Sequence, residues 1–492
     1  MNRMFHSVKS GVIACLLLVV GCSGDGVKTS ETAQQCFENT GHQFNEVLAC
    51  YRAEQARRAL DYVAGEITEF SGVQKRSYVL TSQDWSPNGL VQPAMWQHEV
   101  TIYVPIDALS GRALLVANNG INNAAANAGA KPASDFSEAM ALSIARKTRT
   151  IVVSVSNIPN QYLTYLDDGA ARREDSSVAH SWQLFSQSPP FMSVHVPMME
   201  SLVKSMDLAV RELRPWHIRT FIATGASKRA WAVWLTALAD PRIDAIAPFV
   251  ADILAMDKVL DHTAQSYGGN WPVAFGDYVR EGITEQRKTE QFAQLEQIED
   301  PLLYLRSAYA ERLAIPKYLI NASGDDFFVP DNTRYYLDQL PGVTALRVVP
   351  NSDHGGIKNY LETSLVTLVN RLQHAAALPV MTLRHTGAGV MQVGFSETPV
   401  TVRQWVASDP VSRDFRYACG IRYEATALEP SQKVTVALAA PEQGWSSSFV
   451  EAQFADGFVM TTPVSILPDT YPHAAPPEYG PACKTIPAQA QN

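Results

Sequence analysis

The sequence has no tract of basic residues, few cysteines and, after residue 21, no apolar run long enough to cross a bilayer. Its 49 acidic and 40 basic side chains give a formal net charge of −9, and such a chain without Lys/Arg clusters argues against nucleic acid as a partner. The cysteines form no CxxC pattern, so no zinc site is expected. Glycine pairs such as Gly268-Gly269 lack the context of a phosphate-binding loop, and no metal or cofactor is expected.

The composition is that of a globular protein. Apolar residues make up 46% and charged residues 18% of the 492 positions, with no bias typical of disorder. This length is sufficient for two or three domains. The chain is therefore expected to bury a large core, while nothing in the composition indicates an oligomeric state.

The first 21 residues resemble an export signal. Arg3 and Lys9 form a basic start, and the apolar stretch that follows, residues 11–20, is too short to span a bilayer. It ends in Val19-Val20-Gly21-Cys22, similar to a bacterial lipobox with Cys22 as the lipidated first residue; ordinary secretory cleavage nearby is the alternative. We expect residues 22–36 to form a tether. The protein would then be an envelope lipoprotein, on the outer membrane facing the periplasm or the cell surface, with the lipid as its only membrane contact.

Four cysteines remain once Cys15 and Cys22 are set aside. An even number in an exported protein indicates disulfides, and four cysteines allow three pairings. The closest pairs along the chain are favoured, namely Cys36–Cys50 and Cys419–Cys483.

Strand-like and helix-like segments alternate through the middle of the chain. The expected strands are residues 75–80, 97–104, 113–117, 150–155, 218–224, 245–250, 316–321 and 345–350. The expected helices are residues 135–146, 198–213, 230–238 and 357–377. This alternation predicts an α/β fold with a doubly wound, mostly parallel sheet and helices on both faces.

Two other regions depart from this alternation. Residues 253–313 are helix-like and rich in aromatic and charged side chains, and their position between late strands predicts a helical cap over the carboxyl ends of the strands. After residue 378, short strands with turns, including one at 415–419, predict a small C-terminal β-sandwich. The expected organisation is a body at 37–378 that contains the cap, a β-rich domain at 379–470 and a tail at 471–492 that is loosely ordered except where Cys483 could hold it.

The most informative stretch is Gly225-Ala226-Ser227-Lys228-Arg229. It lies between an expected strand and an expected helix, as in a nucleophile elbow, where a sharp turn exposes a serine hydroxyl beside a helix N-terminus. The usual second glycine of this motif is Arg229 here. Ser227 is a candidate nucleophile, provided that an acid and a histidine follow in the chain.

An acid and a histidine do follow, each directly after an expected strand. His354, in the segment 350–356 with glycines on its C-terminal side, is the candidate base, and Asp325 and Asp326 are alternative acids. The order serine, acid, histidine is that of the α/β-hydrolases. Either aspartate could instead serve as a turn former.

Acyl transfer also needs N–H donors for the oxyanion. The backbone N–H of Lys228, next to Ser227, is one candidate. The loop after strand 113–117 offers the N–H of Gly120 or Ile121, although it lacks a full HGGG motif.

Several segments are together similar to the PhoPQ-activated pathogenicity-related family of bacterial exported proteins, between about residues 44 and 416. These segments are Ile158-Pro-Asn-Gln161, Arg173-Glu-Asp175, Gly225-Ala-Ser-Lys-Arg229, Tyr267-Gly-Gly269, Asp277-Tyr278, Asp300-Pro301 and Pro350-Asn-Ser-Asp-His-Gly355. The resemblance implies an α/β-hydrolase with a cap and a link to virulence and to resistance against cationic antimicrobial peptides. Family members often have Asp-Glu at Asp325-Asp326, which favours Asp325 as the acid.

The resemblance also points to residues that could bind substrate. Glu174 and Asp175 could hold the cationic end of a substrate, or could instead cap a helix or pair with Arg172 and Arg173. Arg229 could orient a substrate carboxylate or form a salt bridge to the cap. The cap aromatics Tyr267 and Trp271 are further candidates.

Together these observations predict an exported serine hydrolase that acts on a peptide or a small ester, with cationic peptides at the cell envelope as one class of substrate. The alternative is an envelope binding protein that retains the hydrolase fold without turnover. The incomplete oxyanion motif and Arg229 in place of glycine keep this alternative open.

Overall fold

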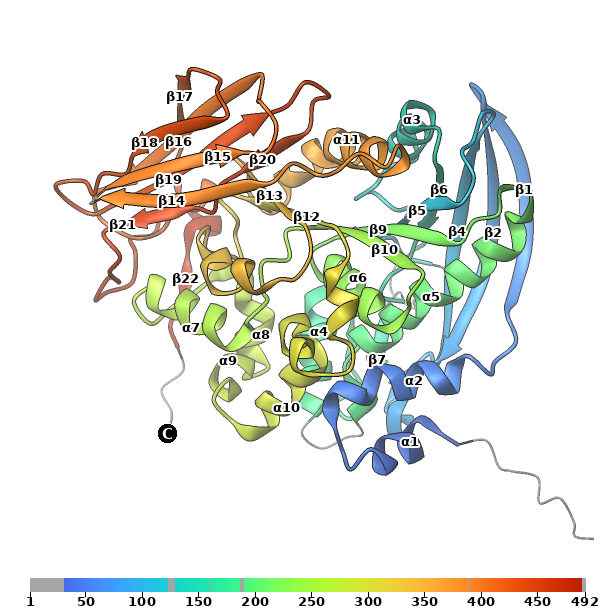
Figure 1. The fold of residues 1–492 in the computed structure, drawn as a ribbon. Coiled ribbons are helices and arrows are strands. Elements are labelled where there is room, and N and C mark those ends of the chain that lie inside the picture. Colours follow the sequence, from blue (N-terminus) through green and yellow to red (C-terminus); the bar gives the residue numbers. More distant parts are fainter. Residues whose placement is uncertain (1–30, 123–128, 161, 186–189, 388, 489–492) are drawn as a thin grey trace, which may run out of the picture.

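The computed structural model describes residues 31–122, 129–160, 162–185, 190–387 and 389–488 (Figure 1). The expected export signal, Cys22 and most of the expected tether lie outside the described residues. In the part of the chain that the structure describes, no helix has both the length and the apolarity needed to cross a membrane.

A nine-stranded sheet forms the centre of the molecule, in the order β1-β2-β4-β6-β5-β9-β10-β12-β13 (Figure 1). Neighbouring strands from β6 to β13 are parallel, whereas β1, β2, β4 and β6 pair antiparallel. The strands are β1 (Asp61–Phe70), β2 (Val73–Asp84), β4 (Met95–Pro105), β5 (Arg112–Ala117), β6 (Ile151–Val155), β9 (Thr220–Ala226), β10 (Ile243–Phe249), β12 (Lys317–Ala322) and β13 (Thr344–Val349). Each of the eight strands expected in this region overlaps one of them.

One strand of this sheet, β1, is not indicated by the sequence pattern. It lies at the edge of the sheet, and most of its residues are exposed, including Val63 and Ile67. Because neither face of β1 is buried, its sequence lacks the alternation of apolar and polar residues that marks a half-buried strand.

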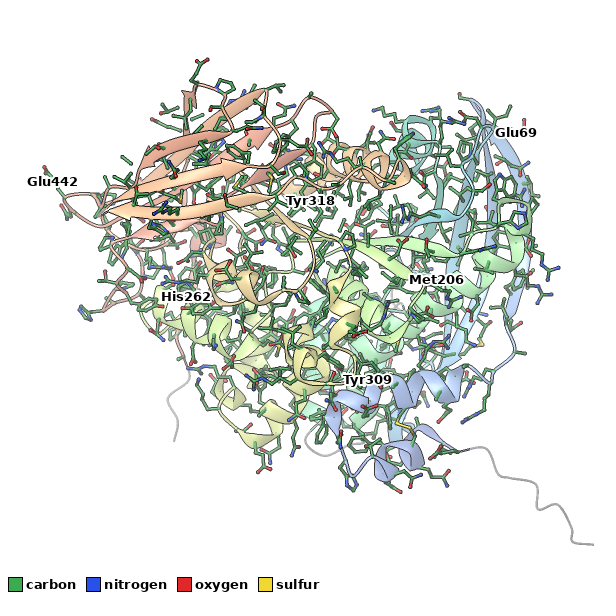
Figure 2. All side chains as sticks on the ribbon, viewed as in Figure 1. Glu69, Met206, His262, Tyr309, Tyr318 and Glu442 are labelled. Atoms are coloured by element: carbon green, nitrogen blue, oxygen red, sulfur yellow. A yellow bond between two sulfur atoms is a disulfide. The ribbon has the colours of Figure 1, made fainter. Side chains whose placement is uncertain are left out.

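Helices cover both faces of the sheet (Figure 1). On one face lie α3 (Glu138–Thr148) and α11 (Leu361–Gln373), and on the other α5 (His195–Glu212) and α6 (Lys228–Ala239). Side chains fill the space between the layers: Met206 of α5 is fully buried, whereas Glu69 of β1 projects from the edge (Figure 2). This is the doubly wound α/β arrangement that the alternation predicts.

The expected helical cap lies between β10 and β12. It comprises α7 (Met256–Ser266), β11 (Trp271–Pro272), α8 (Gly276–Arg280), α9 (Ile283–Gln286) and α10 (Glu290–Glu299). The cap packs against α4 (Glu174–Phe185), which follows a small sheet of β3 (Val91–Gln92), β7 (Leu163–Tyr165) and β8 (Ala171–Arg172).

Two antiparallel sheets follow α11 and form the expected β-sandwich, drawn in orange to red in Figure 1. The first contains β14 (Met381–Gly387), β15 (Val390–Phe395) and β18 (Lys433–Ala437). The second contains β16 (Thr401–Asp409), β17 (Glu424–Leu428), β19 (Trp445–Gln453), β20 (Val459–Thr461) and β21 (Ser465–Leu467). Val393 of β15 and Val450 of β19 belong to one buried apolar cluster, so the two sheets share a core.

The prediction of a strand at 415–419 is wrong. This segment ends in a 3-10 helix, Tyr417–Cys419, and the Tyr417 N–H donates to the Gly324 carbonyl at 3.0 Å. The segment therefore docks on the loop after β12 instead of pairing with a strand. In the tail, β22 (Thr485–Ile486) pairs with β11 of the cap.

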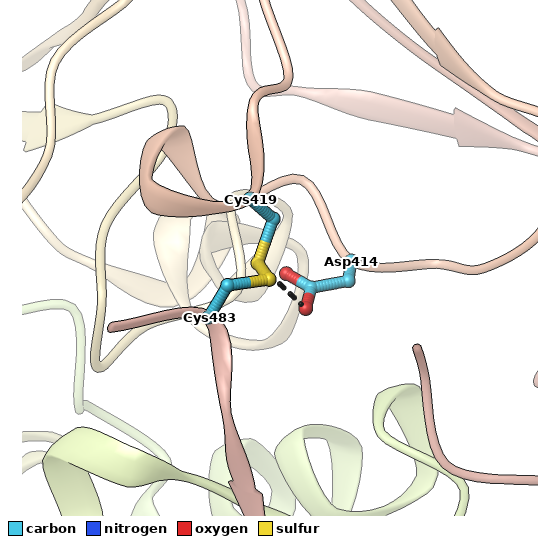
Figure 3. A group of neighbouring side chains, drawn as sticks. All are labelled: Asp414, Cys419 and Cys483. Atoms are coloured by element: carbon cyan, nitrogen blue, oxygen red, sulfur yellow. Dashed lines mark hydrogen bonds between the residues drawn. A yellow bond between two sulfur atoms is a disulfide. The ribbon is translucent and has the colours of Figure 1, made fainter. Parts of the chain in front are cut away.

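Both predicted disulfides are confirmed. Cys36–Cys50 joins α1 (Ala33–Asn39) to α2 (Val47–Gln55), and Cys419–Cys483 joins the loop after β16 to the tail. Figure 3 shows Asp414 beside the second disulfide, with its Oδ2 atom 3.3 Å from Cys419 Sγ.

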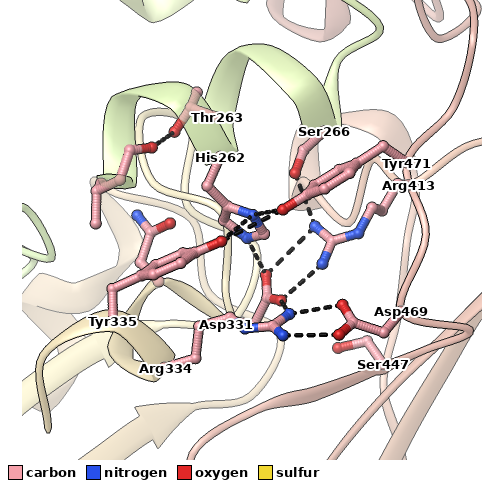
Figure 4. A network of polar contacts seen from close by, with 12 residues as sticks. His262, Thr263, Ser266, Asp331, Arg334, Tyr335, Arg413, Ser447, Asp469 and Tyr471 are labelled. Atoms are coloured by element: carbon pink, nitrogen blue, oxygen red, sulfur yellow. Dashed lines mark hydrogen bonds and ion pairs between the residues drawn. The ribbon is translucent and has the colours of Figure 1, made fainter. Parts of the chain in front are cut away.

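A buried group of polar side chains, the Asp331 network, joins the cap to the C-terminal segments (Figure 4). Asp331 lies 2.8 Å from His262 Nε2 of α7 and 2.6 Å from the Arg413 guanidinium. Tyr471 in the tail bonds to His262 Nδ1 at 2.7 Å, and Arg413 donates to Ser266 at 2.8 Å. Burial alone would raise the pKa of Asp331, but His262 and Arg413 outweigh burial and hold it well below its usual range.

Loss of Arg413 should therefore destabilise the folded protein. Arg413 and Asp331 have side-chain exposures of 0% and 2%, so Arg413→Met leaves a buried, poorly compensated carboxylate. We expect the free energy of unfolding, measured in urea, to fall by about 3–5 kcal/mol. The matched control is Arg58→Met, because Arg58 is 42% exposed and pairs at 2.9 Å with the exposed Asp84 instead of a buried carboxylate; it should cost at most about 1 kcal/mol. Equal losses in the two variants would contradict this account of the network.

Candidate active site

Ser227 lies in a strained turn between β9 and α6. Its φ of 58° and ψ of −130° are unusual for a residue other than glycine, as expected for a nucleophile elbow. A Cβ at Gly225 would lie 2.9 Å from the Arg229 carbonyl group, so only glycine allows the strand and helix to approach so closely. The Ser227 N–H donates to the Phe249 carbonyl of β10 at 2.9 Å, which fixes the turn against the sheet.

His354 and Asp325 are in direct contact, and they follow the adjacent strands β13 and β12. Nδ1 of His354 lies 2.9 Å from each oxygen of the Asp325 carboxylate. Asp325 Oδ1 also accepts the backbone N–H groups of Phe327 and Phe328, at 2.8 and 3.2 Å. Burial opposes a charge on His354, but Asp325 outweighs burial and raises the pKa of the imidazole above its usual value.

The second aspartate, Asp326, has a different environment. It makes no hydrogen bond to His354 within the described residues. Burial, together with the neighbouring Asp325 and Asp353 carboxylates, raises the pKa of Asp326 to about 6. Of the two acids that the sequence leaves open, the structure places Asp325 on the imidazole.

Ser227 and His354 lie at the same site but are not hydrogen bonded to each other. Ser227 lines a pocket together with Phe327 and Phe328, and the Phe327 ring lies 4.8 Å from the His354 ring. Among the described residues, no hydrogen bond to Ser227 Oγ or to His354 Nε2 is present. Hydrogen bonds between catalytic groups are often loose in a free enzyme and tighten when substrate binds.

The loop after β5 lies beside the elbow, because Ala117 pairs with Gly225 in the sheet. Gly120 has a φ of 120°, and a Cβ there would lie 2.8 Å from Asn157 Oδ1, so the loop requires glycine at this position. The Ile121 N–H is already occupied, because it donates to the Lys131 carbonyl at 2.9 Å. Of the two expected donors, only the Gly120 N–H has no hydrogen bond to a described residue.

The charged residues next to Ser227 pair with one another. Lys228 Nζ lies 2.9 Å from Glu174 and 3.1 Å from Asp175, and the Arg229 guanidinium lies 2.6 Å from Glu174. Burial would raise the pKa of Glu174, but Lys228 and Arg229 outweigh burial and hold it well below its usual range. These contacts favour the interpretation of Glu174 and Arg229 as an ion pair within the protein over contacts with substrate.

Arg229 also connects the elbow to the loop after β5. Its Nε–H donates to the Ile158 carbonyl, and its guanidinium lies 3.4 Å from Asp135. Asp135 in turn accepts a hydrogen bond from Asn119 Nδ2 at 3.0 Å. The residue that replaces the second glycine of the elbow motif therefore helps to hold the loop that contains Gly120.

The pocket beside Ser227 is largely apolar. Its aromatic wall comes from α4, α6, the cap and the loop after β12: Trp182, Trp231, Phe275, Tyr278, Phe327 and Phe328. Apart from Tyr278, these residues have no signal in the sequence, since buried aromatics on helices look like ordinary core positions. Only the three-dimensional arrangement brings them to one wall.

Tyr267 and Trp271, which the sequence suggests as substrate-binding residues, do not line this pocket. Each is only 1% exposed. The Arg416 guanidinium lies 5.1 Å from the Tyr267 ring centre, and Trp271 stacks on Phe275. Their role in the structure is packing at the base of the cap, where β11 meets the tail.

Among the described residues, two groups of side chains have the spacing of metal ligands, and both already pair with other groups. In the first, Cys419 and Cys483 are bonded to each other and Asp414 pairs with Arg416 at 2.6 Å. In the second, Asp168 pairs with Arg172, and His180 lies between Asp167 and Glu281.

Solved structures that are similar to this chain include two esterases. An acetyl xylan esterase from Paenibacillus sp. R4 is 11% identical, with 68% of this chain and 95% of that one covered and a TM-score of 0.46. A glucuronoyl esterase from Solibacter usitatus is 13% identical, with 67% and 93% covered and a TM-score of 0.38. At such identities the likeness concerns the fold alone.

Two sequence comparisons extend over most of the chain. Autocrine proliferation repressor protein A of Dictyostelium discoideum is 30% identical over 443 residues, which cover 82% of this chain and 87% of that protein. The family model of the PhoPQ-activated pathogenicity-related protein matches residues 48–416, from α2 to the segment that docks on the loop after β12. This match includes Ser227, Asp325 and His354, and the chain belongs to the PhoPQ-activated pathogenicity-related protein family.

Proposed function

We propose that this chain is a serine hydrolase that transfers the acyl group of an ester or amide to water. Ser227 is the nucleophile, His354 the general base and acid, and Asp325 the carboxylate that orients the imidazole. The observation that carries the proposal is the contact of both Asp325 oxygens with His354 Nδ1. With its proton on Nδ1, the imidazole keeps a basic Nε2 for the serine hydroxyl.

The reaction begins with attack of Ser227 Oγ on the carbonyl carbon, while the hydroxyl proton passes to Nε2 of His354. The carbonyl electron pair moves to oxygen, where the backbone N–H groups of Lys228 and Gly120 stabilise the charge. Collapse of this intermediate breaks the bond to the leaving group, which takes the proton from His354. Water then attacks the acyl-enzyme by the same sequence, releasing the acid and restoring Ser227.

The strain at Ser227 and the arrangement of the loop after β5 support this proposal. The elbow conformation places the Lys228 N–H at the first turn of α6, where the helix dipole favours negative charge. Gly120 offers a second N–H without another partner among the described residues. The incomplete HGGG motif is therefore compatible with two oxyanion donors.

The proposal predicts a particular pH dependence of ester hydrolysis. His354 must be neutral to accept the Ser227 proton, so activity should rise as the pH rises through the His354 pKa. Since Asp325 raises that pKa, the midpoint of the rise in kcat/KM should lie above 6.5, the usual value for histidine. Hydrolysis of a p-nitrophenyl ester as a function of pH measures this midpoint. A rate independent of pH between 5 and 9 would contradict the role of His354.

A further inference from the structure

The charged side chains at the pocket beside Ser227 already pair with one another. Lys228 contributes the only cationic side chain among the pocket residues, and its ammonium lies within 3.1 Å of both Glu174 and Asp175. The second oxygen of Asp175 accepts the Tyr278 hydroxyl at 3.1 Å. No charge in the pocket is left for a charged group of a substrate to pair with.

The rest of the wall is apolar and tightly packed. Ile253, from the loop after β10, and Met256 and Leu260 of α7 face Trp231 of α6, and none of these residues is more than 7% exposed. The cavity volume is about 50 Å³. At about 10–15 Å³ for each water-sized group, this volume holds roughly three to five such groups.

The position of His354 indicates which part of a substrate enters the pocket. A leaving group must be near His354 in order to receive its proton. Ser227, Lys228 and Trp231 line the pocket on the side of α6, whereas His354 borders it on the other side through Phe327, whose ring lies 4.8 Å from the imidazole. The substituent on the other side of the carbonyl, the acyl chain, is therefore the part that the pocket receives.

We propose that this pocket selects a short, uncharged and apolar acyl group of about four carbon atoms, an inference that rests on the hydrolase function proposed above. A carboxylate in the acyl chain would meet Glu174 and Asp175, and an ammonium would meet Lys228. Burial of either charge without a partner is costly. Longer chains meet the closed wall formed by Met256 and Leu260.

A series of p-nitrophenyl esters with one leaving group tests this proposal. From acetate to butyrate, kcat/KM should rise by roughly fourfold for each buried methylene. It should fall again for octanoate. The succinate half-ester, which carries a carboxylate on a four-carbon acyl group, should be hydrolysed at least tenfold less efficiently than butyrate.

Two variants and one matched control relate this order of substrates to the pocket. Met256→Ala enlarges the pocket and should move the preference toward octanoate, whereas Met140→Ala, on α3 at the opposite face of the sheet, should leave the order unchanged. Asp175→Asn leaves Lys228 with one carboxylate, so hydrolysis of the succinate half-ester should improve relative to butyrate. Where turnover is too slow to follow, protection of Ser227 from a fluorophosphonate probe gives the same order.

Three results would overturn the pocket assignment: equal hydrolysis of the succinate half-ester and butyrate, faster hydrolysis of octanoate than of butyrate, or an unchanged order in Met256→Ala. An enzyme that reacts with the probe and gives any of these results remains a serine hydrolase with a different acyl specificity. A folded protein that neither reacts with the probe nor hydrolyses any ester overturns both this proposal and the hydrolase function.

Discussion

Ser227→Ala should reduce turnover to the background level, with a loss in kcat on the order of 10⁶-fold by analogy with removal of the nucleophile in a serine protease. Alanine lacks the oxygen that attacks the carbonyl and can form no acyl-enzyme. The remaining groups, His354 and the backbone N–H donors, can only assist direct attack by water. The measurement is the rate of p-nitrophenyl butyrate hydrolysis by purified, folded protein.

A matched control removes the hydroxyl of a serine outside the pocket. Ser307 lies in the cap, outside the pocket, where its hydroxyl donates to the Tyr304 carbonyl. Ser307→Ala should retain normal turnover. If Ser227→Ala also keeps a normal rate, the hydrolysis comes from another site and the assignment of the nucleophile is wrong.

Asp325→Asn should have the second largest effect, a loss of turnover on the order of 10⁴-fold. The Asn Oδ1 atom can still accept the N–H groups of Phe327 and Phe328, so the loop should keep its conformation. The amide N–H₂ would face His354 Nδ1 and place the imidazole proton on Nε2, the wrong nitrogen for a base. Because Asp325 also raises the pKa of His354, any residual activity should rise at lower pH than in the unmodified protein.

Asp326→Asn is the matched control for this loss. Asp326 is adjacent in sequence and has a raised pKa, but it makes no hydrogen bond to His354 within the described residues. Its substitution should change turnover far less, and the midpoint of the pH profile only slightly. The reverse ranking of the two variants would assign the role of the orienting acid to Asp326.

The sequence predicts the elbow, the histidine, the two alternative acids and both disulfides because each depends on local or chain-order information. Ser227 stands between a strand and a helix, and His354 and Asp325 directly follow strands. Parallel strands place their carboxyl ends at one edge of a sheet, so residues that directly follow these strands lie close to one another. The family resemblance favours Asp325 over Asp326, but the choice rests on the contact with His354, because both aspartates occupy the same loop.

Other features depend on contacts between distant segments and have no local signal. The segment 415–419 has the residues of a strand, yet it docks on Gly324 and is held by a disulfide. The tail pairs with β11 of the cap, more than 200 residues away along the chain. The pocket wall collects aromatic residues from several elements, and each of them alone resembles a core residue.

Arg229, which stands in place of the second glycine of the elbow motif, also makes contacts that the sequence does not indicate. In sequence it is a departure from the motif of an active hydrolase. In the structure Arg229 is 3% exposed and contacts Glu174, Asp135 and the Ile158 carbonyl. The larger side chain therefore has a structural role between the elbow and the loop that contains Gly120.

The most direct test of the central claim is reaction of the purified protein with a fluorophosphonate probe, followed by mass spectrometry of the labelled peptide. Such a probe reacts with an activated serine whatever the natural substrate is. We expect one label per chain, located on Ser227, absent in Ser227→Ala and strongly reduced in His354→Ala. A folded protein that remains unlabelled, or a label on another serine, would contradict the claim that Ser227 is an activated nucleophile.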